Sequence, residues 1–163
     1  MKPISLAKSV TALLAASSLI ATPVAAAPVG LSVVPVVNGH FGELSVLPTD
    51  KTGNWSMLLK THADTDVGAD QITLAGGGST GWHSHPAAVF VTVTSGSIVW
   101  YDGTNPVCPG HHYGVGDSFM EGAGVIHNAV NASGSADAQF IAVRMNPTGV
   151  PFVAPEDKPT NCS

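Results

Sequence analysis

Charged residues are scarce in this sequence. Asp, Glu, Lys and Arg together make up 10% of the 163 residues, whereas soluble domains usually carry about 25%. Basic residues are the rarer kind, with six Lys and Arg against eleven Asp and Glu and a formal net charge of −5. This balance argues against a nucleic-acid or anionic-membrane partner, because both are bound mainly through clusters of basic side chains. Arg144 is the only arginine, so a polyphosphate substrate, which usually needs Arg or Lys clamps, is not expected either.

The sequence also lacks helical patterns of about a dozen residues between its apolar segments, which disfavours a parallel α/β fold. It has 18 glycines and 12 prolines, and its 44% apolar content is too high for a disordered chain. Ser95-Gly96 is predicted to be a hairpin turn, and residues 38–42 a turn that enters a strand. Many short strands joined by turns indicate an all-β sandwich, barrel or jelly roll. The predicted strands are 42–47, 56–61, 70–74, 80–85, 89–94, 97–101, 117–121, 127–131 and 139–145.

The apolar segment at residues 10–21 is too short to span a bilayer of about 30 Å. It follows Lys2 and Lys8 and precedes small residues at 24–27, a pattern typical of a secretory signal peptide. We predict a signal peptide at 1–26 and an exported domain at 27–163, periplasmic or secreted and free of the membrane after cleavage. Cleavage removes two of the six basic residues and none of the eleven acidic ones, so the net charge becomes −7. An anchored N-terminal helix is the alternative.

Only two cysteines are present, Cys108 and Cys162. An even number of cysteines in an exported protein indicates a disulfide. This bridge would attach the Pro-rich tail, residues 147–163, to a loop in the middle of the chain. A pair of metal thiolates is the weaker alternative, because the two cysteines lie 54 residues apart and neither belongs to a metal-ligand pattern.

Seven histidines stand out in a chain with so few charges. His83 and His85 lie two residues apart in a predicted strand, so both side chains point to the same face and can reach one ion. His127 follows a second glycine-rich turn. His111 and His112 are placed in a loop after Pro109-Gly110, and a plain surface pair is favoured over a proton shuttle at the rim of a pocket. His40 and His62 have no partner in a motif, and no role is assigned to them.

These residues, with the glycines around them, resemble the two motifs of the cupin superfamily. The first motif, Gly-x5-His-x-His-x3-4-Glu-x6-Gly, is matched by Gly77, His83, His85 and Gly96, and the second, Gly-x5-Pro-x-Gly-x2-His-x3-Asn, by Gly116, Gly124, His127 and Asn131. The resemblance implies a single-domain, all-β double-stranded β-helix (a jelly-roll barrel) with its core at about residues 40–146. It also implies metal ligation by His83, His85 and His127. Since cupins often dimerise, it allows a homodimer.

The sequence departs from the motifs at two positions, because Val89 stands in place of the glutamate and Gly122 in place of the proline. Val89 removes the usual anionic ligand and leaves three neutral imidazoles. Imidazole binds Zn, Cu, Fe and Ni, and cupin enzymes often use Fe or Mn, so the identity of the metal stays open among these five. Glu121 is a candidate ligand or general base, and so a candidate catalytic residue, if it faces inward. The favoured interpretation is a solvated charge at a strand end, which predicts that Glu121→Gln leaves the metal content unchanged.

Three functions remain open. The first is an exported protein that binds one divalent transition metal, with an unknown substrate. The second is a metal-dependent oxygenase acting on a small chelating substrate such as a diketone, enediol or flavonol. The third is a metal-free module that binds a small molecule. This hypothesis is based on Val89, which removes the usual anionic metal ligand. Val89, Val91 and Val93 alternate and are expected to line the barrel, and Trp82 is expected to pack against its wall. A ligand would then be small and partly apolar, with one chelating end.

Overall fold

The computed structural model describes residues 26–46, 53 and 56–163. The predicted signal peptide at 1–26 therefore lies outside the described residues except for Ala26. Among the described residues, no helix has the length and apolar character that crossing a bilayer requires. The strands are β1 (Val29–Phe41), β2 (Ser45–Val46), β3 (Leu59–Lys60), β4 (Thr65–Ser79), β5 (His83–Ser84), β6 (Val89–Ser95), β7 (Ser97–Asp102), β8 (Gly110–Gly114), β9 (Ser118–Glu121), β10 (His127–Asn131), β11 (Ala138–Pro147) and β12 (Ala154–Pro155).

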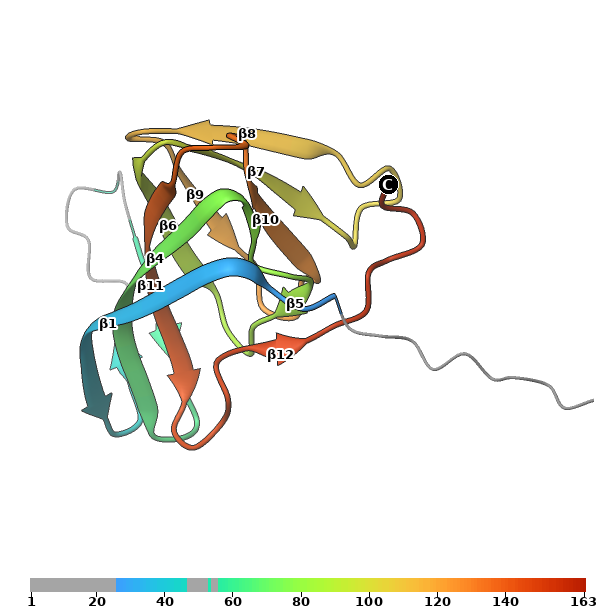
Figure 1. Cartoon of the computed structure of the whole chain (residues 1–163). Coiled ribbons are helices and arrows are strands. Elements are labelled where there is room, and N and C mark those ends of the chain that lie inside the picture. Colours follow the sequence, from blue (N-terminus) through green and yellow to red (C-terminus); the bar gives the residue numbers. More distant parts are fainter. Residues whose placement is uncertain (1–25, 47–52, 54–55) are drawn as a thin grey trace, which may run out of the picture.

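The strands form two antiparallel layers that curl into a barrel (Figure 1). One layer runs in the order β1-β4-β11-β6-β9, and the other in the order β12-β5-β10-β7-β8. The long strand β4 joins them, because it pairs with β11 over residues 65–74 and with β10 at Ser79. The all-β cupin-type barrel predicted from the sequence is confirmed.

The barrel interior is filled by side chains that alternate along the strands. Val89, Val91 and Val93 on β6 are at most 1% exposed, as their alternation predicted. They pack with Leu74 and Ile98 in one apolar cluster. Fully burying an aliphatic side chain of this size contributes about 1.5–3 kcal/mol, so this cluster stabilises the scaffold behind the site.

Two segments predicted as turn or loop are strands. Residues 38–41 belong to β1 and pair with residues 65–68 of β4, so the predicted turn at 38–42 is wrong. The loop predicted around His111 and His112 is strand β8, which pairs with β7. In both cases, the glycine in or next to the segment was interpreted as the end of a strand. Pairing with a neighbouring strand keeps each of these segments extended.

The predicted hairpin at Ser95-Gly96 is also wrong. Strand β6 pairs with β9 and β11, whereas β7 pairs with β8 and β10. The chain therefore turns from one layer to the other at Gly96, whose φ of 66° suits glycine. Two β-type runs separated by a glycine fit such a corner as well as a hairpin.

The C-terminal tail runs past β5 as β12 and ends near the loop that follows β7 (Figure 1). Cys108 and Cys162 form the predicted disulfide, with a Cα–Cα distance of 5.2 Å. The tail is also held by a hydrogen bond of 3.0 Å from the Glu156 backbone N–H to the Trp82 carbonyl. Paired strands thus extend from Val29 to Pro155, beyond the expected core of about 40–146.

Candidate metal centre

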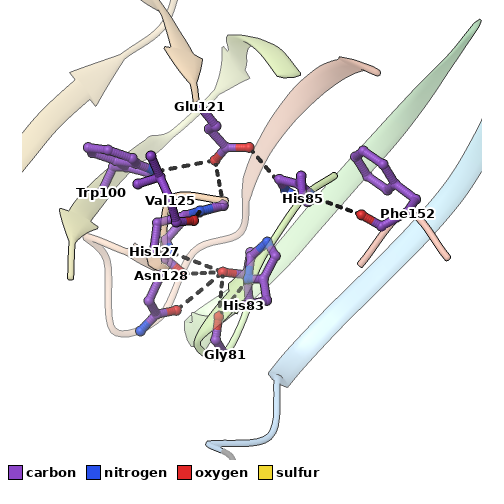
Figure 2. A network of polar contacts seen from close by, with 11 residues as sticks. Gly81, His83, His85, Trp100, Glu121, Val125, His127, Asn128 and Phe152 are labelled. Atoms are coloured by element: carbon purple, nitrogen blue, oxygen red, sulfur yellow. Dashed lines mark hydrogen bonds and ion pairs between the residues drawn. The ribbon is translucent and has the colours of Figure 1, made fainter. Parts of the chain in front are cut away.

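The three predicted histidines lie together inside the barrel (Figure 2). His83 on β5 and His127 on β10 are direct partners in the strand register, and their ring centroids lie 4.3 Å apart. The ring of His85, two residues after His83, lies 4.8 Å from that of His83 and 5.0 Å from that of His127. The potential ligand atoms of all three lie within 4.8 Å of one another. All three side chains are buried.

Each imidazole is oriented by a hydrogen bond from its Nδ1 to a backbone carbonyl. His83 bonds to the carbonyl of Gly81 at 2.8 Å and His127 to that of Val125 at 2.8 Å. His85 bonds to the carbonyl of Phe152 at 2.9 Å. A carbonyl only accepts, so Nδ1 carries the proton, and in a neutral imidazole Nε2 then carries a lone pair. This arrangement is typical of histidines that bind metal through Nε2.

Two glycines shape the turns that deliver these rings. Gly81 has φ of +72°, and the carbonyl of Ala26 occupies the space that a Cβ at this position would need. Gly124 has φ of +69°, and its N–H donates to the carbonyl of His85 at 2.9 Å. Side chains at these two positions would strain the turns before His83 and His127.

Glu121 on β9 is part of this cluster (Figure 2). Its Oε1 lies 3.2 Å from His127 Nε2 and its Oε2 lies 3.3 Å from His85 Nε2. The Trp100 Nε1–H donates to Oε1 at 3.2 Å. Glu121 is 6% exposed, so the expectation of a solvated charge at a strand end is wrong. The physical reason is strand alternation, which turns Phe119 and Glu121 inward.

The carboxylate and the imidazoles perturb one another's pKa values. Burial by itself would raise the pKa of Glu121, but the adjacent imidazoles of His127 and His85 outweigh burial and lower it to about 2. Burial lowers the pKa of His83 to about 4, and the neighbouring His127 adds to the effect. Burial opposes protonation of His127 as well, but Glu121 outweighs it and raises the pKa. At neutral pH the cluster therefore holds an ionised carboxylate beside a neutral His83.

The cluster opens onto a cavity of about 380 Å³. His83, His85 and Glu121 line one part of it, and Val89 lies beside them. The other walls are mostly apolar and include Leu31, Ile72, Phe119, Phe140 and Phe152. Trp82 also contributes to the wall but packs with the disulfide in a second apolar cluster, which confirms its expected packing role.

Sequence reasoning missed an ion pair in the same cavity wall. Asp70 is 5% exposed and accepts a hydrogen bond of 2.7 Å from Arg144 Nε through its Oδ2. The guanidinium carbon lies 5.2 Å from the centroid of the Phe152 ring, and this ring stacks on His85 with a centroid distance of 4.3 Å. The signal available in the sequence was that the only arginine lies in a predicted strand that is mainly apolar.

The remaining polar residues singled out in the sequence lie elsewhere. His111 and His112 are exposed on β8 and are not among the residues that line the cavity, which confirms the surface pair. Asp117, which precedes β9, accepts a hydrogen bond from the Gly114 N–H at 2.8 Å. His40 is exposed and contacts Asp66 at 3.0 Å.

Comparison with known proteins agrees with this architecture. Residues 71–144 match the model of the Cupin_2 family, described as a cupin domain. No curated protein matches the chain. Among solved structures, a cupin-like protein from Thermotoga maritima is 17% identical, with a TM-score of 0.52 over 78% of this chain and 77% of that one.

Two further structures share the fold. Peruvianin-I, described as a cysteine peptidase from Thevetia peruviana latex, is 22% identical, with a TM-score of 0.53 over 88% of this chain and 77% of that one. A recombinant oxalate oxidase in complex with glycolate is 18% identical, with a TM-score of 0.50 over 85% of this chain and 61% of that one. At such identities the likeness concerns the fold alone. Together with the barrel topology, the match of residues 71–144 to the cupin domain model supports membership of the cupin superfamily.

Proposed function

We propose that this protein binds one divalent transition metal ion through His83, His85 and His127. The observation that carries the proposal is the orientation of the three rings, each of which donates through Nδ1 to a backbone carbonyl. Three Nε2 lone pairs are thereby directed into one small volume. A divalent cation held by these nitrogens would also neutralise the ionised carboxylate of Glu121, a charge that is costly to bury unpaired. Zn, Cu, Fe, Mn and Ni are the metals this site would take.

The cavity supports a small, partly apolar ligand with one chelating end. Its walls are mainly aliphatic and aromatic, whereas the imidazoles and Glu121 occupy one part of it. A bound metal would act there as a Lewis acid that polarises an oxygen donor of the ligand. The apolar walls would hold the rest of the ligand and exclude water from that contact.

Elemental analysis of protein purified without added metal tests the proposal. We expect close to one equivalent of a transition metal in the wild type and a background amount in His83→Ala/His127→Ala. His112→Ala is the matched control, because it removes an exposed imidazole of β8 and should keep the metal. Equal background metal in all three proteins would overturn the proposal and leave the metal-free binding module.

A metal-dependent oxygenase is the second candidate, favoured by a ligand cluster that opens onto a cavity large enough for a small molecule. We expect O₂ consumption with a catechol, a 1,3-diketone or a flavonol as the test substrate, measured with an oxygen electrode on the Fe, Mn, Ni and Cu forms. The double histidine variant should consume none. If no metal form turns over any substrate of the panel, the result contradicts the oxygenase and favours a metal-binding protein.

We also propose that the protein is exported, as its N-terminal pattern predicts. The Cys108–Cys162 disulfide supports this, because such bridges persist in oxidising compartments. N-terminal sequencing of the exported protein should begin at Ala27. A mature protein that still carries residues 1–26 would contradict the signal peptide.

A homodimer through β1 is the partner we propose. Within the part of the chain that the structure describes, this strand pairs with β4 alone, and it exposes an apolar strip of a kind that usually marks a contact surface. The strip consists of Val33, Val34, Val36 and Val37. Sedimentation analysis should find a dimer in the wild type and a monomer in Val34→Lys/Val36→Lys, whereas a monomeric wild type would refute the proposal.

A further inference from the structure

The geometry points to Glu121 as the anionic metal ligand of this site, supplied by β9 in place of the glutamate that β6 lacks at Val89. This inference rests on the proposed metal function and adds a fourth protein ligand to it. It reverses the expectation, drawn from the sequence, that Glu121→Gln leaves the metal content unchanged.

The strand register places Glu121 directly beside the vacated motif position. Val89 on β6 and Glu121 on β9 are antiparallel partners, and both side chains line the cavity. The Cβ atoms of directly paired residues lie about 4.5–5.5 Å apart. A glutamate side chain is long enough to cover this offset, so a carboxylate carried by β9 reaches the same volume as one carried by β6.

The distances from Glu121 to His85 and to His127 match those between neighbouring ligands of one ion. Metal–ligand bonds of about 2.1 Å place neighbouring ligand atoms about 3.0–3.4 Å apart in octahedral or tetrahedral arrangements. The Glu121 oxygens lie 3.2 Å from His127 Nε2 and 3.3 Å from His85 Nε2. His127 Nε2 is buried and makes no hydrogen bond, even though Oε1 lies so close. A metal cation bound by both atoms would satisfy this nitrogen and balance the charge of the carboxylate.

The carboxylate is held in this orientation from behind. The Trp100 Nε1–H donates to Oε1, and the indole is 9% exposed. Outer hydrogen bonds of this kind fix the orientation of ligating carboxylates. With Glu121 as a ligand, a divalent ion and its protein ligands would together carry a net charge of +1. The ion would then be a weaker Lewis acid than the same ion bound by the three imidazoles alone.

Co²⁺ titration of the metal-free protein, followed by visible absorption, tests the assignment, because the Co²⁺ bands report the ligand set as well as the affinity. We expect Glu121→Gln to weaken Co²⁺ binding at least about tenfold, by analogy with the loss of site-supporting groups, and to change the band positions. Glu43→Gln is the matched control, since Glu43 is exposed, and it should bind as the wild type does. The exchange variant Val89→Glu/Glu121→Val returns the carboxylate to β6 and should recover affinity.

Two results would overturn the assignment while the proposed metal function stands. One is a Glu121→Gln variant with the affinity and spectrum of the wild type. The other is weaker binding with an unchanged spectrum, which would make Glu121 a positioning residue. A wild type that binds no Co²⁺ or other transition metal would instead overturn the proposed function. Near-UV circular dichroism of each variant confirms that the barrel has folded.

Discussion

Removing the disulfide should destabilise the protein by about 4 kcal/mol. The perturbation is Cys108→Ala/Cys162→Ala, in which alanine avoids burying a hydroxyl because both cysteines are buried. The bridge joins residues 54 apart, and the loop-closure entropy of a loop of this length corresponds to about 4 kcal/mol at 25 °C. Without the bridge, the unfolded state of the variant gains this entropy. The full difference appears in the free energy of unfolding when the tail stays bound in the folded state.

The folded tail has contacts that keep it in place without the bridge. Strand β12 pairs with β5, and the Ser84 hydroxyl donates to Glu156 at 2.7 Å. Urea denaturation at pH 7 with metal removed should therefore show a lower midpoint for the double variant. A difference below about 1 kcal/mol would refute the loop-entropy reasoning.

Three further changes probe separate parts of the barrel. Arg144→Met should lower the free energy of unfolding, measured by urea denaturation, by about 3–5 kcal/mol because it leaves the buried Asp70 carboxylate unpaired. Adding Asp70→Asn should recover most of the loss. Equal stabilities of the wild type and Arg144→Met would contradict the importance of the pair. The pKa of His83 falls to about 4 in the folded protein, so below pH 6.5 the unfolded chain binds more protons at this residue. His83 alone should therefore remove up to about 3 kcal/mol of stability from the metal-free protein as the pH falls from 7 to 4, and the raised pKa of His127 opposes this loss. His83→Asn should flatten this pH dependence, and an unchanged slope would exclude His83 as its source. The two N–H groups of the Asn131 side-chain amide are shared among three backbone carbonyls within 2.9 Å. Asn131→Ala should therefore lower stability by about 2–4 kcal/mol, whereas a loss well below 1 kcal/mol would show that water replaces these bonds.

The sequence predicted the parts of the site that depend on local geometry. His83 and His85 share a face because side chains alternate along a strand, and His127 was found through its motif spacing. The disulfide followed from the number of cysteines in a predicted exported chain. These predictions needed no knowledge of which strands are neighbours.

The parts that failed depend on strand neighbours. The inward orientation of Glu121 is decided by the pairing of β9 with β6, which nothing in the sequence around Glu121 specifies. Strand β1 is mainly apolar but is interrupted by Ser32, Pro35 and the segment Asn38-Gly39-His40, so it lacks the alternation that identifies a strand. Its pairing with β4 keeps it extended. The corner at Gly96 was taken for a hairpin because both use the same residues.

The position of Glu121 also changes how Val89 bears on function. Valine at the glutamate position favours loss of metal binding only if the site has no carboxylate, and the site has one on the paired strand. A buried carboxylate among buried imidazoles is expensive to desolvate, and apolar residues of similar volume would often be neutral or stabilising in its place. A divalent cation bound by the imidazoles would neutralise this charge. Val89 therefore does not by itself argue for a site that has lost its metal, because the proposed metal ligation accounts for the carboxylate on the paired strand.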